Sequence, residues 1–227
     1  GISVSDGMST NTLGTSNFIA GVNAGNSIVS GGNYNVVIGD EAGTAITTGD
    51  FNSATGYSAG SGLTTGIENT IAGALAGVAL TDADYNVAIG VQALATDTKG
   101  SKSTAIGNQT LYLQNFATST DSLNTAVGYQ AGRTVTTGVQ NTLIGALAGD
   151  AITTGGGNVA VGYLALTAST TASANNALGV AALAANTTGA DNVAIGTSAL
   201  ASNTTASNNT AVGKAALTAN TTGTENV

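Results

Sequence analysis

The sequence predicts an all-β fold, a parallel β-solenoid or β-roll built from 17-residue repeats. A glycine closes a recurrent Asn-x-Ala-(Val/Ile)-Gly motif at nearly constant intervals, two apolar residues precede that glycine, and proline is absent. The intervals are all equal, except for two longer ones that end at Gly39 and at Gly128. A period this strict indicates that each unit is one coil of a repeating structure. The motif glycines are Gly21, Gly39, Gly56, Gly73, Gly90, Gly107, Gly128, Gly145, Gly162, Gly179, Gly196 and Gly213.

Each repeat is numbered from its motif glycine, which is position 0. Positions −2 and −1 are apolar in nearly every unit, position +3 is usually Ala, and position +10 is usually a second glycine. Two threonines often precede that second glycine, as Thr47 and Thr48 precede Gly49. Glycine suits turns, whereas Thr, Val and Ile favour strands, so we expect two short strands and two turns in each coil. A helix–turn–helix repeat needs about twice this length.

The apolar pair before the glycine predicts that the motif strand is buried on both faces. Adjacent strand residues face opposite sides, so one face fills the inside of the coil and the other needs a different partner. An identical chain is the simplest partner, which predicts an oligomer with the motif strand on its axis. The position −1 residues that we expect to be buried in this strand are Ile38, Ile89, Ile106, Val127, Ile144, Val161, Ile195 and Val212.

Asparagine recurs at position −4 in all repeats but one, where Ser103 replaces it. Stacked amides can hydrogen-bond from coil to coil, so we expect a structural asparagine ladder. The alternative is an exposed column that binds a ligand. The ladder residues are Asn35, Asn52, Asn69, Asn86, Asn124, Asn141, Asn158, Asn175, Asn192 and Asn209, with Asn17 before them.

The repeats divide the chain into a degenerate first coil, residues 1–16, and a β-roll of about 12 coils, residues 17–227. We expect the chain to be a segment of a longer fibre. One repeat gains four residues within 109–123. Insertions in repeat proteins emerge as loops that often bind ligands, which makes Lys99, Lys102, Tyr112 and Phe116 candidate contacts for a glycan or an acidic polymer. The alternative is a loop whose aromatic residues pack back on the roll.

Composition argues against several classes of function. A formal net charge of −8 disfavours nucleic acid as a partner. The absence of histidine and cysteine removes the usual catalytic triads and most zinc sites. The close acidic pairs, Asp40 with Glu41 and Asp82 with Asp84, are expected at turns. We therefore expect no enzyme, no cofactor and no bound metal. No stretch has the roughly 18 apolar residues of a membrane span.

Three segments carry a resemblance to a known family. Asn-Thr-Ala-Val-Gly-Tyr-Gln-Ala-Gly (124–132), Asn-Val-Ala-Ile-Gly-Thr-Ser-Ala-Leu (192–200) and Asn-Thr-Ala-Val-Gly-Lys-Ala-Ala-Leu (209–217) resemble the head repeats of YadA-type trimeric autotransporter adhesins. The longer unit, with Ala-Asn-Thr-Thr-Gly at 185–189 and 219–223, is similar to the form in phage tail and capsid fibre proteins. The resemblance implies a left-handed β-roll and an elongated homotrimer. Those adhesin heads have a somewhat shorter repeat.

These observations favour a structural and adhesive fibre segment from a phage tail or capsid fibre, and the alternative is a bacterial trimeric autotransporter adhesin head. The expected location is extracellular, on a virion or bacterial surface. The expected partners are identical chains and a host cell-surface glycan or protein. An ice-binding β-solenoid is a third hypothesis, but the recurrent threonines are adjacent and their side chains diverge. A depolymerase is a fourth, and the chain has few acids and no histidine for it.

Overall fold

The structure is a computed structural model that describes residues 8–9 and 13–227. It divides into two compact units, residues 1–108 with 115–121, here called the N-terminal unit, and residues 109–114 with 122–227, the C-terminal unit. Both consist of short β-strands, loops and turns, and the described residues contain no helix.

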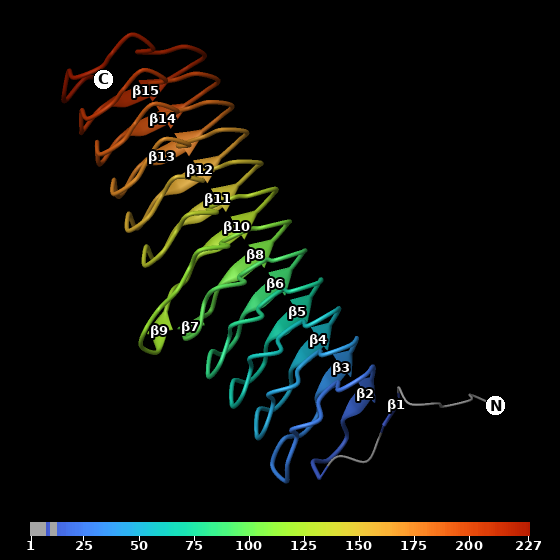
Figure 1. Cartoon of the computed structure of the whole chain (residues 1–227). Helices are drawn as coiled ribbons and strands as arrows, with labels where there is room; N and C mark the ends of the chain where they lie inside the picture. The colour runs from blue at the N-terminus through green and yellow to red at the C-terminus, as the bar shows by residue number, and fades with distance from the viewer. Residues whose placement is uncertain (1–7, 10–12) are drawn as a thin grey trace. The chain divides into compact units, whose positions relative to one another are not determined.

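The N-terminal unit is a stack of coils in which each motif contributes one strand to a parallel ladder (Figure 1). The register places equivalent motif positions opposite one another, as Val37 with Ala54 and Ala54 with Ile71. The ladder strands are β2 (Phe18–Ala20), β3 (Val36–Ile38), β4 (Ser53–Thr55), β5 (Thr70–Ala72), β6 (Val87–Ile89) and β8 (Thr104–Ile106). A separate parallel pair joins β7 (Gly100–Ser101) to β9 (Thr120–Asp121).

The start of the chain departs from the expected coil. Most of the predicted first coil, residues 1–16, lies outside the described residues. The described strand β1 (Met8–Ser9) pairs antiparallel with β2, Met8 opposite Ala20 and Ser9 opposite Ile19. A parallel coil would require the opposite strand direction, so these two residues do not form one.

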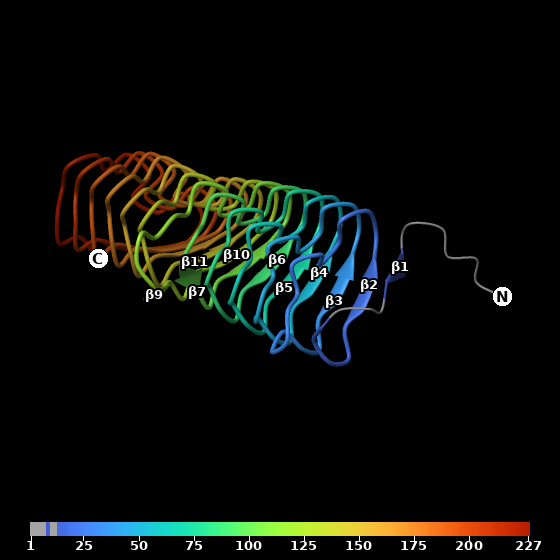
Figure 2. The same cartoon turned by 60° about the horizontal axis from the view of Figure 1, so that its bottom comes forward.

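The C-terminal unit repeats the same design, and its coils follow one another along the stack (Figure 2). Leu143 pairs with Ala160 and Ala160 with Ala177, in each case one repeat apart. The structure confirms an all-β parallel solenoid in which one repeat of the sequence forms one coil. The strands are β10 (Thr125–Val127), β11 (Thr142–Ile144), β12 (Val159–Val161), β13 (Asn176–Leu178), β14 (Val193–Ile195) and β15 (Thr210–Val212).

Most coils contain one strand and not the two that the sequence pattern predicted. The return stretch is joined to the next coil by single backbone hydrogen bonds, such as that from the Thr47 N–H to the Thr64 carbonyl at 2.9 Å. Positions +2 and +4 adopt positive φ, 57° at Gln92 and 52° at Leu94. Because the backbone turns twice within these three residues, no extended run forms between positions +2 and +4.

Small side chains at fixed positions fill the interior of each coil. Position −2 is the central strand residue and points inward, and position +3 contributes an alanine in most repeats. The buried residues at position −2 are Ile19, Val37, Ala54, Ile71, Ala88, Ala105, Ala126, Leu143, Ala160, Ala177, Ala194 and Ala211. The motif glycine permits this close stacking: a Cβ on Gly162, which has φ 139°, would lie 2.5 Å from the carbonyl oxygen of Gly179. No side chain fits that gap.

The coils fill the remaining core volume in two alternative ways. In one type, position +4 is glycine and position +7 is a large apolar residue, as in Gly43 with Ile46. In the other, position +4 is leucine and position +7 is polar, as in Leu183 with Asn186. A Cβ on Gly43 would lie 2.8 Å from the Cδ1 of Ile46, so one coil cannot hold both large side chains. The first type is found at Gly25, Gly43, Gly60, Gly77, Gly132 and Gly149, and the second at Leu94, Leu111, Leu166, Leu183, Leu200 and Leu217.

Candidate functional site

The asparagines at position −4 of the N-terminal unit form a continuous buried hydrogen-bond ladder. The Nδ2 of Asn52 donates to the Oδ1 of Asn35 at 3.2 Å and to the Gly66 carbonyl at 2.8 Å. Its own Oδ1 accepts the backbone and side-chain N–H groups of Asn69, both at 3.0 Å. At Ser103 the backbone N–H continues the pattern by donating to the Oδ1 of Asn86 at 2.9 Å.

The C-terminal unit carries the same ladder from Asn124 to Asn226. A second, shorter ladder forms at position +7, where the Nδ2 of Asn203 donates to the Oδ1 of Asn186 at 3.0 Å and that of Asn220 to the Oδ1 of Asn203 at 3.2 Å. From Asn35 to Asn209, the position −4 amides are at most 1% exposed. These amides therefore face one another and backbone groups, and not solvent.

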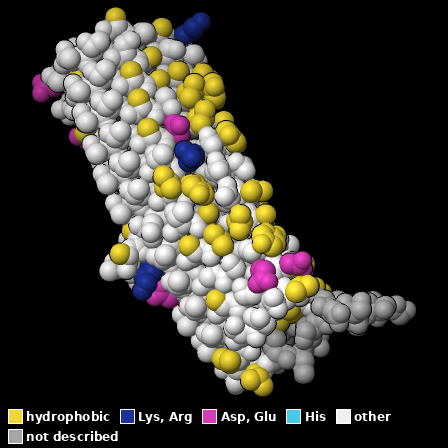
Figure 3. Space-filling model, viewed as in Figure 1, with side chains coloured by type: hydrophobic (Ala, Val, Ile, Leu, Met, Phe, Trp, Pro, Cys, Tyr) yellow, Lys and Arg dark blue, Asp and Glu magenta, His cyan; other side chains and the backbone are white. Residues whose placement is uncertain are grey.

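The position −1 residues lie on the opposite side of the motif strand, at the surface of the chain. Ile89, Ile144 and Ile195 are 38–39% exposed and Val212 is 66% exposed, whereas Ile38, Ile106, Val127 and Val161 are half-buried. Position +1 adds further exposed apolar side chains, namely Val22, Tyr57, Val91, Tyr129, Tyr163 and Val180. We call positions −1 and +1 together the outer apolar face. In Figure 3, hydrophobic side chains gather along one edge within each unit.

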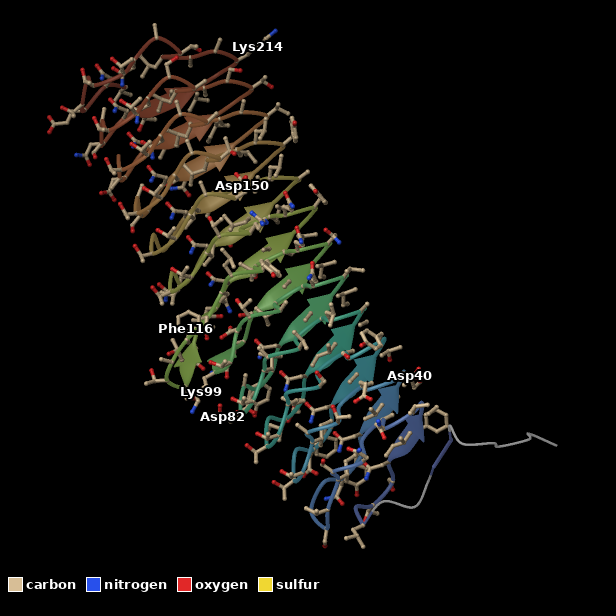
Figure 4. The ribbon with its side chains drawn as sticks, in the orientation of Figure 1. Asp40, Asp82, Lys99, Phe116, Asp150 and Lys214 are labelled. Atoms are coloured by element: carbon tan, nitrogen blue, oxygen red, sulfur yellow. The ribbon has the colours of Figure 1, made fainter. Side chains whose placement is uncertain are left out.

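Three of the four candidate contact residues near the insertion belong to the N-terminal unit, where each has a partner within the chain. Lys99 Nζ lies 3.6 Å from the Oδ2 of Asp82, and Lys102 Nζ donates to the Oδ2 of Asp121. Phe116 is buried, and its backbone N–H donates to the Oδ1 of Asp97 at 3.2 Å. Figure 4 shows the side chains of Lys99, Asp82 and Phe116 at one edge of the unit.

The fourth candidate, Tyr112, is half-buried and belongs to the C-terminal unit. The guanidinium carbon of Arg133 lies 5.9 Å from the centre of its ring, within the range of a cation–π interaction. Lys99 and Lys102 are therefore each paired with a carboxylate of the same chain.

The close acidic pairs hold neighbouring coils together. The Oδ1 of Asp40 accepts the Val22 N–H at 3.1 Å, and the Oε1 of Glu41 accepts the Nδ2 of Asn23 at 2.8 Å. The Oδ1 of Asp84 accepts the Ile67 N–H at 2.8 Å. These carboxylates are therefore bonded to the preceding coil and are not arranged as a pair across a cleft.

One exposed column was not identified from the sequence. Position −5 of the N-terminal unit carries Tyr34, Phe51, Glu68, Tyr85 and Lys102 in successive coils, all with positive φ and all exposed. The rings of Tyr34 and Phe51 stack, with centroids 4.9 Å apart and an interplanar angle of 7°. Reading the repeat at position −5 would have revealed the column, because each of these residues lies one repeat after the last.

The fold and these surfaces define a repeat protein of the parallel β-solenoid class. None of the described segments is a membrane-spanning helix. Neither a protein-family model, nor a curated protein, nor a solved structure matches the chain.

Proposed function

We propose that the chain is a structural and adhesive fibre segment that assembles as a homotrimer through its outer apolar face. The observation that carries the proposal is the contrast between the two sides of the motif strand. Ala88 and Leu143 are fully buried inside their coils, whereas the adjacent Ile89 and Ile144 are more than one third exposed. Apolar residues that recur on one surface of successive coils are typical of an interaction surface.

An identical chain suits this surface better than an unrelated partner. The outer apolar face recurs with the spacing of the coils, so a second copy presents apolar side chains at the same spacing. Closed symmetric assemblies of identical chains are the common form of soluble oligomers. The number three rests on the resemblance of the repeats to YadA-type heads.

A spacing and adhesive role is consistent with the interior of the chain. Hydrogen bonds at positions −4 and +8 join each coil to the next, as from Asn158 to Asn141 at 3.0 Å and from the hydroxyl of Thr136 to the Thr153 carbonyl at 3.1 Å. Such a stack provides a stiff scaffold with side chains at fixed intervals. We place this segment outside the cell, on a virion or bacterial surface, with a non-catalytic role.

Light scattering tests the assembly directly. One chain weighs 21.7 kDa, so the proposal requires a mass about three times that value. Ile89→Asp and Ile144→Asp, one in each unit, place a carboxylate in the outer apolar face, and the double variant is expected to lose the three-chain mass. Thr137→Asp is the matched control, because this exposed residue lies at position +9, outside that face. A three-chain mass that survives the double exchange, or a well-folded single chain of the unmodified sequence, contradicts the proposed assembly.

A further inference from the structure

The stacked pair Tyr34 and Phe51 leaves one face of the Phe51 ring without an aromatic neighbour. Tyr34 covers the other face with its ring centroid 4.9 Å away. The next residue of the column is Glu68, and Tyr85 follows one coil further on. Backbone hydrogen bonds fix this order, since the Glu68 N–H donates to the Asp50 carbonyl at 3.0 Å and the Tyr85 N–H to the Ile67 carbonyl at 3.1 Å.

An open hollow of about 410 Å³ lies against Phe51 and Glu68. The Glu68 side chain is exposed, and its carboxylate has no hydrogen bond or ion pair with any described residue. An aromatic face and an unpaired carboxylate therefore line the same hollow.

The surroundings of this hollow are negatively charged. Asp50 and Asp84 directly precede Phe51 and Tyr85, and each is held in place because it accepts a backbone N–H of the preceding coil, at 2.6 Å from Asn33 and at 2.8 Å from Ile67. The cation of the same column, Lys102, is paired with Asp121. No described lysine or arginine is paired with Glu68.

We propose that the surface formed by Phe51 and Glu68 binds an alkylammonium group, most favourably a trimethylammonium group. A cation is attracted to the face of an aromatic ring when it lies within about 6 Å of the ring centre. Tyr34 covers the face of Phe51 on the side of the preceding coil, and Glu68 lies in the next coil, about 4.8 Å further along the column. A methylated ammonium in the hollow therefore contacts the Phe51 ring, and the Glu68 carboxylate beside it supplies the opposite charge.

The chemistry of the site favours a cation over a neutral or anionic ligand. A neutral ligand gains only contact with the ring, whereas a cation also interacts with the carboxylate of Glu68 and with the field of Asp50 and Asp84. An anion is repelled by all three. The residues come from a single chain, so this proposal goes beyond the assembly proposed above and its test is independent of that assembly.

Titration with choline, monitored by the proton resonance of its N-methyl groups, tests the site on the full chain. We expect saturable binding with an upfield shift of that resonance, because a group held over a ring face lies in its shielding region. The uncharged isostere 3,3-dimethylbutan-1-ol is expected to bind at least about tenfold more weakly. Phosphocholine is also expected to bind more weakly, since its phosphate meets the acidic surroundings. The comparison of choline with phosphocholine therefore distinguishes a site for a free alkylammonium group from a site for a phosphate-bearing head group.

Three variants assign the binding to these residues. Glu68→Gln and Phe51→Leu are each expected to weaken choline binding about fivefold or more. Gln140 and Leu123 already occupy position −5 with φ of 60° and 53°, so both exchanges suit the local backbone. Asp191→Asn is the control, because it removes the same charge at position −5 between Ala174 and Asn208, where no ring is adjacent.

Three results overturn the proposal. One is the absence of saturable choline binding at millimolar concentrations, another is equal binding of the uncharged alcohol, and the third is an equal effect of Asp191→Asn and Glu68→Gln. The last result would show that net charge alone attracts the ligand.

Discussion

Gly149 and Ile152 compete for the same core volume, which Leu143 also borders: a Cβ on Gly149 would lie 2.8 Å from the Cδ1 of Ile152 and 2.8 Å from the Cδ2 of Leu143. The next coil solves the same packing problem in the opposite way, with Leu166 at position +4 and Ser169 at position +7, both fully buried. The core volume of a coil is therefore filled from one of two positions. A destabilising change at position +4 is therefore expected to be offset in part by the opposite change in size at position +7.

Exchanging both residues together is expected to cost less than the sum of the single exchanges. Gly149→Leu overpacks the coil and is expected to destabilise it by about 1–3 kcal/mol. Ile152→Asn leaves a cavity and buries an amide, at about 2–5 kcal/mol. In the double variant the leucine occupies part of the volume that Ile152 leaves, while Leu143 still borders it, so the compensation is partial. The introduced asparagine lies one coil from the hydroxyl of Ser169. Urea unfolding at one fixed chain concentration measures the coupling. Strictly additive losses would contradict the two-type description of the coils.

Ser169→Asn is expected to stabilise the C-terminal unit. The Oγ of Ser169 is buried without a hydrogen-bond partner, although Asn186 and Asn203 form a ladder in the following coils. Leu166 gives this coil the same type as that of Leu183, so the site accommodates asparagine in the same way. One added rung is worth about 0.5–1.5 kcal/mol. A rise in the urea midpoint checks the prediction. Ser169→Ala is the companion variant, expected within about 0.5 kcal/mol of the parent because no hydrogen bond is lost. A lower midpoint for Ser169→Asn than for Ser169→Ala would count against the ladder extending this far.

Asn158→Ala should destabilise the chain far more than Asn176→Ala. The Asn158 side chain donates to Asn141 and to the Ala172 carbonyl and accepts two N–H groups of Asn175. Its removal leaves buried partners unsatisfied, which costs about 1–3 kcal/mol for each such group. Asn176 is exposed on the outer side of β13, so the same exchange there is expected to change the free energy of unfolding by less than about 0.5 kcal/mol. Equal losses for both variants would mean that the buried ladder adds no stability.

Two glycines of one coil are expected to differ in their tolerance of alanine. Gly162→Ala forces a Cβ against the Gly179 carbonyl and is expected to cost about 3 kcal/mol or more, because backbone, not side chain, blocks it. Gly157→Ala, at φ 69°, meets no atom closer than 3.9 Å. The next coil has Ala174 at φ 58° in the equivalent position, so we expect only the backbone cost of about 1–2 kcal/mol. Thermal unfolding of the two variants side by side gives the comparison, and similar transition temperatures would be incompatible with the tight stacking at position 0.

The period of the motif was sufficient to predict the solenoid, because paired residues of neighbouring strands and stacked asparagines lie one repeat apart. The Asn158 amide meets Asn141 for the same reason that Val159 pairs with Asn176. The second strand was wrongly expected in most coils. The threonines at positions +8 and +9 favour strands, but the positive φ at positions +2 and +4, which the residue types alone do not reveal, shortens the stretch in which a strand could form.

The surfaces were less predictable than the interior. The pairing of Lys99 with Asp82 follows from their separation by one repeat, whereas the pairing of Lys102 with Asp121 has a longer offset that depends on the inserted segment. The partners of Phe116 likewise depend on how 115–121 folds, and no repeat template describes it. The sequence contains both coil types, Gly43 with Ile46 and Leu183 with Asn186. The reason for the two types is visible only from the short distance between Gly43 and the Ile46 side chain.

The hydrogen bond from Asn192 to Asn175 joins two residues one repeat apart in sequence, and most backbone hydrogen bonds between regular coils join residues within one position of that offset. Removing or duplicating a whole coil therefore brings equivalent positions into contact again. Such a molecule can change its length in evolution by unequal recombination without a new packing solution. A deletion of another size keeps the register only where a loop absorbs the difference, as in the longer unit that ends at Gly39, where Ile19 still pairs with Val37. Within a strand it turns apolar residues of that coil outward.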